Sequence, residues 1–307
     1  MLTLQNNVIR NNRGNRGAGI AATGNGVKGG IALMEGNVVE DNIGYGDHGG
    51  GVYVSVEDLT FRNNLVQRNS TTGWGGGIIC HSGAVMKMSN NVVTRNVAST
   101  GGGIFSDEGA DIFMDHDLVY KNYSYRGVGA AIYVDGGNAS SITIKSSTIA
   151  HNNLVGAVEN GRVVEKPPVA NGRSNSLFMQ IDTVATVENS IFWGNGPDEF
   201  YVEPNCTLNI SHSIAQTTRT GGGAFNVSNV TTVDPMFADV ANDNYRLKSA
   251  AGRWNDATNT WANDTVTSPA IDKGNPTAAF ANEAAPNGGR MNLGFDGNTA
   301  RTSKSGS

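Results

Sequence analysis

The chain of 307 residues is poor in charge. Only 16% of its residues are Asp, Glu, Lys or Arg, well below the quarter that is usual in globular proteins. The net charge is -5, and Lys and Arg form no cluster along the sequence. A basic surface is therefore not expected, which argues against nucleic acid as a partner.

Long apolar runs and a secretory leader are also missing. No stretch is long enough to span a membrane, and residues 1–5 already follow the repeat described below. We therefore expect either a longer natural N-terminus or a trimmed chain. The two cysteines, Cys80 and Cys206, fall several repeats apart, so we expect no disulfide between them. Cys80 occupies an inward position of the pattern, as a small apolar filler.

Glycine, with 41 residues, is abundant, and so is asparagine. Both belong to a repeat that is clearest in 58–122, where three passes of one unit begin at Leu59, Met86 and Ile112. Each pass leads into a turn of small residues followed by isoleucine: Gly75-Gly-Gly-Ile78, Gly101-Gly-Gly-Ile104 and Gly129-Ala-Ala-Ile132. A fixed period of this length indicates a solenoid, in which each unit buries its apolar face against its neighbours.

A polar anchor residue aligns the units. The anchors are Asn7, Asn37, Asn64, Asn91, Asp117, Ser147, Ser190 and Ser213. Apolar residues stand three and five positions before each anchor, usually with a polar residue between them, and this alternation predicts a strand with one face inside. Asparagine recurs five positions after most anchors. Its side chain tolerates a left-handed bend, and its amide can bond the same group in the next coil.

A third strand follows the glycine-rich turn and begins at Ile20, Val52, Ile78, Ile104 and Ile132. The sequence therefore predicts an all-β fold: a right-handed parallel β-helix of three strands per coil and about eight coils over residues 1–233. The longest spacing between anchors holds a loop at about 156–175 that would overhang one face. We expect residues 234–301 to cap the end of the solenoid and residues 302–307 to be disordered.

Two features resemble known families. The Gly-Gly-Gly-Ile turns between Val-x-x-x-Asn units resemble the repeats of bacterial right-handed β-helix surface proteins, including the polymorphic outer-membrane family. The tail, with Asp234-Pro-Met-Phe237 and Ser268-Pro-Ala-Ile-Asp-Lys-Gly274, is similar to the end of secreted choice-of-anchor proteins. The resemblance implies an extracellular or cell-surface β-helix of the pectate-lyase-like superfamily. Such proteins include polysaccharide lyases, glycoside hydrolases and adhesins, so the activity stays open.

Alternation along the third strand predicts two outward columns. One column is apolar and aromatic, and contains Tyr53, Ile79, Phe105 and Tyr133; the other is polar, and contains Ser55, His81, Asp107 and Asp135. Trp74 and His48, four residues before strand-opening positions, are placed at the rim of the same face. Aromatic rings beside carboxylates suit a sugar chain, but outward aromatic side chains also stack on each other without binding a ligand.

Three uses of the acids remain open at this stage. Asp107 and Asp135, one coil apart, suit a general acid and base, with His81 assisting. Together with Glu108 they equally suit calcium, and they are also compatible with a solvated surface pair. Arg126 is placed to bind a uronate carboxylate. No cofactor is required by this scheme.

The sequence thus favours an extracellular protein that binds a polysaccharide along the third-strand face, with Tyr53, Phe105, Tyr133, Trp74, Arg126 and His48 as binding residues. It leaves lyase, hydrolase and no catalysis open. The competing hypotheses are a non-catalytic adhesin and a structural protein that self-assembles through an uncapped N-terminal coil.

Overall fold

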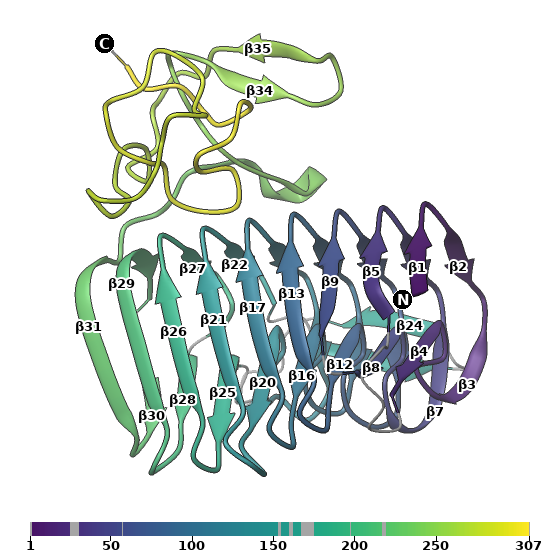
Figure 1. Ribbon diagram of the computed structural model, residues 1–307. Helices are drawn as coiled ribbons and strands as arrows, with labels where there is room; N and C mark the ends of the chain where they lie inside the picture. The colour runs from purple at the N-terminus through teal and green to yellow at the C-terminus, as the bar shows by residue number, and fades with distance from the viewer. Residues whose placement is uncertain are drawn as a thin grey trace.

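The protein is a right-handed parallel β-helix of about seven turns, close to the eight coils expected (Figure 1). The computed structural model describes residues 2–24, 31–56, 58–152, 155–159, 162–166, 175–196, 198–216 and 219–306. Within these residues no helix has the length and apolar character needed to cross a membrane.

The first and second strands of the turns form one 16-stranded sheet. Its first strands are β1 (Leu2–Gln5), β5 (Ile31–Glu35), β9 (Leu59–Arg62), β13 (Val85–Ser89), β17 (Asp111–Asp115), β21 (Ser141–Lys145), β26 (Val184–Glu188), β29 (Thr207–Ala215) and β31 (Ala224–Thr231). Its second strands are β2 (Val8–Arg10), β6 (Val38–Glu40), β10 (Leu65–Gln67), β14 (Val92–Thr94), β18 (Leu118–Tyr120), β22 (Thr148–Ala150) and β27 (Ile191–Trp193). The long strand β29 pairs with both β26 and β27, which joins the two series.

The third strands form an eight-stranded sheet. They are β4 (Ile20–Thr23), β8 (Val52–Ser55), β12 (Ile78–Cys80), β16 (Ile104–Ser106), β20 (Ile132–Asp135), β25 (Asn175–Gln180), β28 (Asp198–Val202) and β30 (Arg219–Gly221). Five turns carry an additional short strand before the glycine turn, which the sequence did not predict. These are β3 (Arg13–Arg16), β7 (Ile43–His48), β11 (Ser70–Thr71), β15 (Val97–Ala98) and β19 (Tyr123–Ser124).

The inward residues form one continuous core along the solenoid. The positions predicted three residues before the anchors are buried there, among them Met34, Phe61, Met88 and Met114. Cys80 and Cys206 are also buried, and both are free thiols. The prediction of the core from period-two alternation is therefore confirmed. It works because every turn must bury the same apolar face against its neighbours.

Two ladders of polar side chains hold the bends. In the anchor ladder, Asn64 donates from its backbone N and from Nδ2 to Oδ1 of Asn91, at 2.9 and 3.1 Å. Its Nδ2 also donates to the carbonyl oxygen of Met34 at 3.0 Å. The second ladder runs from Asn12 through the later asparagines to Asn195 with the same geometry, and Glu199 closes it by accepting from Asn195. These bonds satisfy buried amides that would otherwise destabilise the fold.

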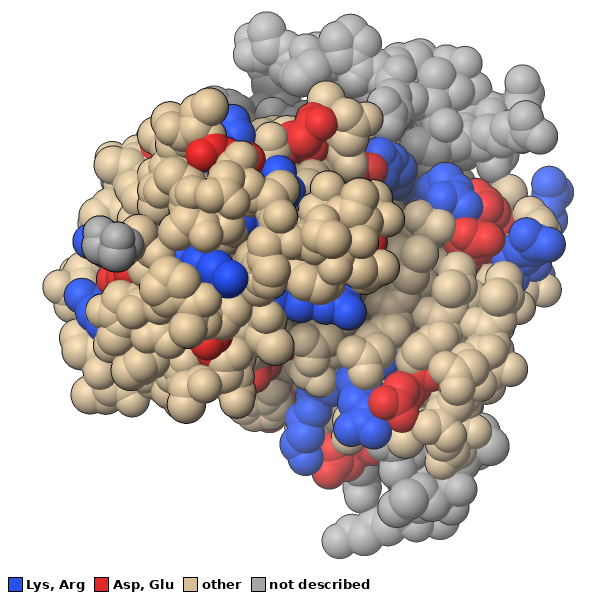
Figure 2. Space-filling model, turned by 90° about the horizontal axis from the view of Figure 1, so that it is seen from above, with Lys and Arg blue, Asp and Glu red and all other residues tan. Residues whose placement is uncertain are grey.

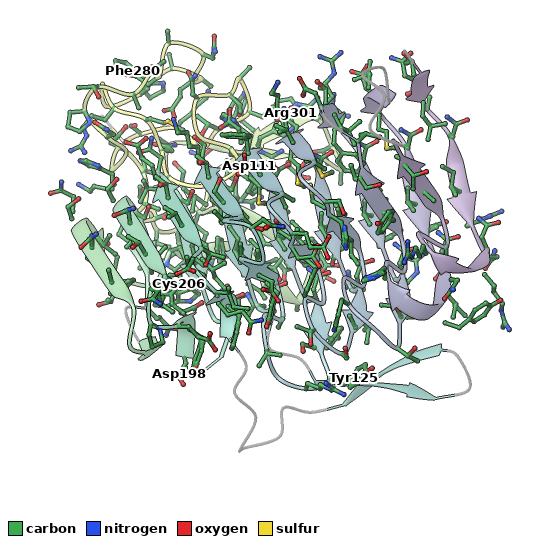
Figure 3. The ribbon with its side chains drawn as sticks, turned by 60° about the horizontal axis from the view of Figure 1, so that its bottom comes forward. Asp111, Tyr125, Asp198, Cys206, Phe280 and Arg301 are labelled. Atoms are coloured by element: carbon green, nitrogen blue, oxygen red, sulfur yellow. The ribbon has the colours of Figure 1, made fainter. Side chains whose placement is uncertain are left out.

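The long insertion contains an antiparallel hairpin, formed by β23 (Val155–Glu159) and β24 (Arg162–Lys166). The sequence predicted a loop at 156–175; the rest of that stretch, apart from residue 175 in β25, lies outside the described residues. Strand β23 contacts β19, and Figure 3 shows the hairpin beside the bend that carries Tyr125.

The C-terminal region packs on the flank of the solenoid, above the second strands in Figure 1. It contains β32 (Phe237–Asp239), the short 3-10 helix η1 (Val240–Asn242), β33 (Asn244–Leu247), β34 (Arg253–Asn255) and β35 (Thr260–Ala262). Its apolar residues Phe237, Tyr245 and Leu293 share a core with outward residues of the second strands, such as Leu118 and Ile191. This apolar contact explains why Leu118, although it points away from the main core, is buried.

This placement corrects two expectations about the tail. The C-terminal region lies along the side of the solenoid, whereas most side chains of the terminal strand β31 are exposed. The expected disorder at 302–307 also does not hold for the described residues. Ser303 is 3% exposed, and its hydroxyl donates to the carbonyl oxygen of Leu247 at 2.6 Å, while Ser305 donates to Asp272 at 2.6 Å.

Candidate functional site

The third-strand sheet brings His81, Asp107 and Asp135 together as the sequence predicted. The pairing aligns Cys80 with Ser106 and Ser106 with Val134, so the residues that follow stand at the same position in successive turns. The same register continues directly from Asp135 to Gln180. We call these four side chains, with Ser55, the acid column. Parallel pairing spaces its members about 4.8 Å apart.

Asp107 is the most perturbed acid of the column. The residue is 7% exposed, and its Oδ1 has no hydrogen-bond partner among the described residues. Burial, followed by the nearby charges of Glu108 and Asp135, raises the pKa of Asp107 to about 7. Asp107 is therefore able to carry a proton at neutral pH, as a general acid must.

His81 lies between Asp107 and Glu108. Its Nε2 is 3.7 Å from Asp107 Oδ1, and its Nδ1 is 3.6 Å from Glu108 Oε2. Burial lowers the pKa of His81; the charge of Glu108 opposes this effect, and the charge of Arg16 adds to it. The shifts of His81 and Asp107 both favour the neutral forms, so their contact has less ionic character than an ordinary imidazolium–carboxylate pair.

A hydrogen-bonded chain orients the solvent side of this pair. His81 Nδ1 contacts the Ser82 hydroxyl, which in turn donates to Glu108 Oε2 at 3.1 Å. On the other side of the column, Gln180 Nε2 donates to Asp135 Oδ2 at 2.7 Å. The two acids therefore differ in environment: Asp107 is desolvated, whereas Asp135 is held by an amide donor.

The expected exposure of the aromatic strip of Tyr53, Phe105 and Tyr133 is wrong. These residues do point away from the main core, but they are only 4%, 2% and 7% exposed. They belong to a separate cluster, in which Phe105 and Tyr133 stack almost parallel, whereas the Tyr53 ring is tilted by 40° to that of His81. The stack, which we call the aromatic ladder, runs through Trp74, Phe105, Tyr133, Phe178 and Tyr201, with ring centroids 5.6, 5.0, 4.7 and 4.4 Å apart.

The glycine turns explain this burial. The turn before each third strand folds back over the strand, so that a Cβ on Gly101 would stand 2.9 Å from Phe105, and one on Gly129 would stand 2.8 Å from Tyr133. Both glycines have positive φ, at 63° and 57°, a conformation that glycine adopts at little cost. Outward aromatic side chains are thus covered by their own turn.

Trp74 and His48 remain as the accessible rim of the site. Trp74 is 39% exposed and is the end of the aromatic ladder. The His48 ring lies 5.2 Å from Trp74 and 5.3 Å from His81, so His48 stands between the indole and the imidazole that contacts Asp107. Arg126 is exposed on the bend before β20, where Tyr125 donates to the carbonyl oxygen of Thr72.

The calcium hypothesis for Asp107, Glu108 and Asp135 gains no support. Among the described residues, no group of three or more His, Cys, Asp or Glu side chains is arranged to hold a metal ion. A desolvated carboxyl whose pKa is raised to about 7 is also a weaker ligand for a hard cation, which binds ionised oxygens.

Sequence reasoning missed Gln180 and Arg16. Gln180 was hidden because the long insertion separates its turn from that of Asp135, although a strand pattern at Leu177 and Met179 would have extended the column. Arg16 precedes the first glycine turn and pairs in register with His48 on β7. No pattern in the sequence singles it out from the other exposed arginines.

The fold and this column define a parallel β-helix repeat protein with a desolvated acid on its third-strand sheet. Residues 99–274 match the family described as disaggregatase related, and because the match spans more than half of the chain, the protein belongs to the disaggregatase-related family. Comparison with curated proteins and with solved structures gave no match.

Proposed function

We propose that this is an extracellular carbohydrate-active protein that binds a polysaccharide across the acid column and cleaves it there. The observation that carries the proposal is the pairing of Asp107, whose pKa is raised to about 7, with Asp135 one turn away. Two carboxyl groups in different environments are what glycosidic cleavage requires. Membership of the disaggregatase-related family and the resemblance to surface β-helix proteins support the extracellular setting.

In this scheme the two acids have opposite roles. Protonated Asp107 donates its proton to the bridging oxygen of the glycosidic bond as that bond breaks. Asp135, which accepts from Gln180, attacks the anomeric carbon as the nucleophile, since a spacing of about 4.8 Å leaves no room for a water between the two acids. Water then hydrolyses the glycosyl-enzyme, with Asp107 acting as the base. In an elimination the neutral His81 would instead take the proton from the sugar carbon beside a carboxylate. Trp74 offers its exposed ring to a sugar face, and His48 and Arg126 bind flanking groups.

The test is a screen of neutral and acidic polysaccharides with two readouts, new reducing ends for hydrolysis and absorbance of unsaturated uronates for elimination. Asp107→Asn and Asp135→Asn should each reduce product formation by about a hundredfold or more. Asp41→Asn is the matched control, because Asp41 is an exposed acid on a distant bend that pairs with Arg68. Its activity should equal that of the wild type.

A non-catalytic surface protein is the second candidate. Burial of the aromatic ladder favours it, because stacking alone accounts for Phe105 and Tyr133. Under this reading no polysaccharide yields product, and Asp107→Ala leaves glycan binding unchanged. That pair of results would defeat the enzymatic proposal.

A further inference from the structure

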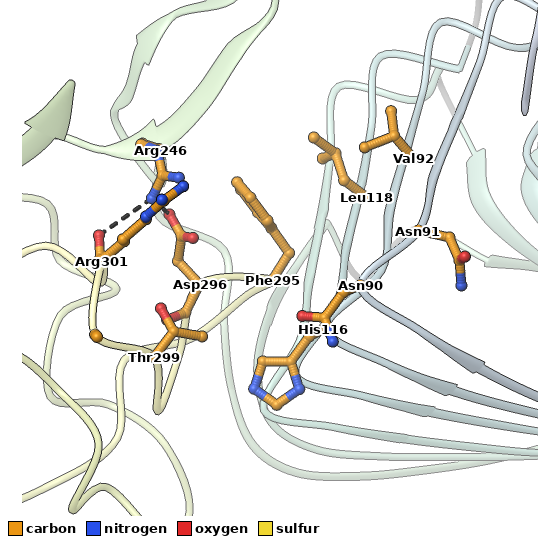
Figure 4. A pocket seen from close by; sticks show the side chains of 11 residues that line it. Asn90, Asn91, Val92, His116, Leu118, Arg246, Phe295, Asp296, Thr299 and Arg301 are labelled. Atoms are coloured by element: carbon orange, nitrogen blue, oxygen red, sulfur yellow. Dashed lines mark hydrogen bonds and ion pairs between the residues drawn. The ribbon is translucent and has the colours of Figure 1, made fainter. Parts of the chain in front are cut away.

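A groove separates the C-terminal region from the solenoid flank (Figure 4). Its larger part has a volume of about 540 Å³, and a second hollow of about 370 Å³ shares Val92, Leu118, Arg246 and Phe295 with it, so the two adjoin. Volumes of about 300–1,000 Å³ are typical of small-molecule sites. The groove lies at the bend between first and second strands, whereas the acid column follows the third strands.

One wall of the groove is apolar. Val92 and Leu118 begin two neighbouring second strands, and the ring of Phe295 lies in the lining opposite them. Phe295 is only partly buried although it packs against the flank core. A half-open aromatic ring beside two aliphatic side chains offers a flat apolar surface to a ligand.

The remaining lining is polar but carries a balanced charge. The Arg246 guanidinium is bound by Asp256 through Nε and Nη2, and by Asp296 through Nη1 at 2.5 Å. Arg301 is more exposed and lies 3.6 Å from Asp256. The third basic side chain of the lining is His116, whose Nδ1 lies 2.9 Å from Asp115. The two arginines and His116 are therefore matched by Asp256, Asp296 and Asp115, and Figure 2, which looks onto this side, shows Lys and Arg interspersed with Asp and Glu rather than a patch of one sign.

Hydrogen-bonding groups are left available at the rim. Asn90 is exposed on its bend, and Asn242, Asn244 and Asn255 line the smaller hollow. Each of these three amides makes one local hydrogen bond, through Nδ2 of Asn242 and through Oδ1 of Asn244 and Asn255, and keeps its other polar atom for a ligand. The hydroxyl of Thr299 donates to the Asp296 carbonyl and can still accept a bond. Amides and hydroxyls that both donate and accept complement the hydroxyl groups of a sugar, and they do so without net charge.

We propose that this groove is a second, non-catalytic site that binds a neutral oligosaccharide, with one sugar face on Phe295 and its hydroxyls on Asn90 and Thr299. The balanced arginines and aspartates disfavour phosphate and polyuronate ligands, because a net anion would meet as many carboxylates as guanidinium groups. The site does not depend on catalysis at Asp107.

The experiment is calorimetric titration and saturation-transfer NMR with cellotriose and triacetylchitotriose as neutral probes, and trigalacturonate and inorganic phosphate as charged probes. We expect at least one neutral probe to bind, and Phe295→Ala to weaken it by about tenfold or more. Phe113→Ala is the matched control, since Phe113 is 43% exposed on β17 outside the groove.

A second variant separates loss of binding from loss of folding. Asn90→Gly removes the amide at a position whose φ is 55°, where glycine is well tolerated. Asn63→Gly, at the same bend one turn earlier with φ 56°, is its control. Weakened binding in Asn90→Gly alone supports the site. The proposal is overturned if neither neutral probe binds, if only the charged probes bind, or if Asn63→Gly and Asn90→Gly behave alike.

Discussion

Asp117 is the one acid in the anchor ladder. Asn91 donates to its Oδ1 from the backbone N at 2.7 Å and from Nδ2 at 2.9 Å. Its Oδ2 is buried without a partner among the described residues, and by the ladder register it faces the carbonyl of Met88 rather than a donor. Burial disfavours the charged carboxylate and raises the pKa of Asp117 to about 7, although the hydrogen bonds from Asn91 act in the opposite direction.

Replacing this residue with the ladder's usual amide should therefore stabilise the protein. Asp117→Asn supplies the missing donor without changing the side-chain shape, and we expect a gain of about 1–3 kcal/mol at pH 8, the cost of an unsatisfied buried group. The gain should shrink at pH 5, where Asp117 is protonated. Denaturant unfolding at both pH values measures it, with Asp58→Asn, an exposed acid paired with Lys87, as the control. An equal change at the two pH values would contradict the protonation argument.

The acid column could be predicted from the sequence because, in a parallel register, equivalent residues of successive turns lie side by side. His81, Asp107 and Asp135 follow strands of identical pattern, so counting was sufficient. Counting was not sufficient to judge exposure: the sequence indicated that Phe105 points away from the core, but not that a turn covers it. Burial of an outward residue depends on the path of the backbone through the glycine turn, which alternation does not report.

Among the elements, the glycine turn is the one whose sequence is most constrained. A Cβ on Gly102 would lie 2.0 Å from the carbonyl oxygen of Tyr123 in the next turn, and one on Gly76 would lie 2.5 Å from that of Val97. Both contacts involve backbone atoms, which cannot rotate away. The turns can stack closely enough to cover the aromatic ladder only because they lack side chains at these positions.

Gly102→Ala should therefore destabilise the protein by about 1–3 kcal/mol or more, as overpacking does. It should also expose the aromatic ladder, which near-ultraviolet circular dichroism and tyrosine fluorescence would detect. Gly24→Ala is the comparison, because a Cβ there meets nothing closer than 3.6 Å. Equal melting temperatures for the two variants would show that the backbone of the turn can shift to accommodate a Cβ, and would contradict this prediction.

The C-terminal region illustrates what repeats leave undetermined. Its apolar residues, such as Phe237 and Leu293, follow no period, so their register against the solenoid could not be predicted. A cap on the last turn was the natural expectation for a solenoid. The outward Leu118, Ile191 and Ile214 were the missed signal, since apolar residues on the outer face of β18, β27 and the end of β29 that pairs with β27 require a cover.

At the scale of the whole molecule, several buried carboxyl groups shift in the same direction. Burial raises the pKa of Asp107 and of Asp117 to about 7, that of Glu199 to about 8 and that of Asp296 to about 6. In each case the folded protein keeps a proton that the unfolded chain has released above about pH 4. Folding is therefore linked to proton uptake in this range.

The free energy of unfolding should accordingly fall as the pH rises from about 5 to about 8. His116 acts in the same direction: burial lowers its pKa, but hydrogen bonds to Asp115 and to the Gly297 carbonyl outweigh this and raise it. The pKa values of His81 and His151 are lowered, so these two residues make the free energy of unfolding rise with pH. This opposing effect ends at the ordinary pKa of histidine, about 6.5. Melting temperatures measured across this interval test the sum, and a flat or rising profile would refute it.

The position of the C-terminal region has a consequence for cooperativity. In an isolated solenoid each turn touches only its neighbours, so unfolding can begin at either end and spread turn by turn. Here one segment reaches across many turns: Asp243 binds Arg95 at 2.7 Å and Lys121 at 2.6 Å, and Asn275 binds Glu188 at 2.6 Å. These contacts couple the bridged turns, so that one turn cannot unfold without breaking contacts that also hold the others.

Hydrogen exchange should therefore divide the molecule into two blocks. Amides of β18, β22 and β27 should open together with a single free energy, whereas those of β6, in an earlier turn, should open more readily. Asp243→Ala should lower protection in β14 and β18 while leaving β6 unchanged. A smooth gradient of opening free energy along the solenoid would instead mean that the C-terminal region does not couple the turns, and that they still unfold one after another.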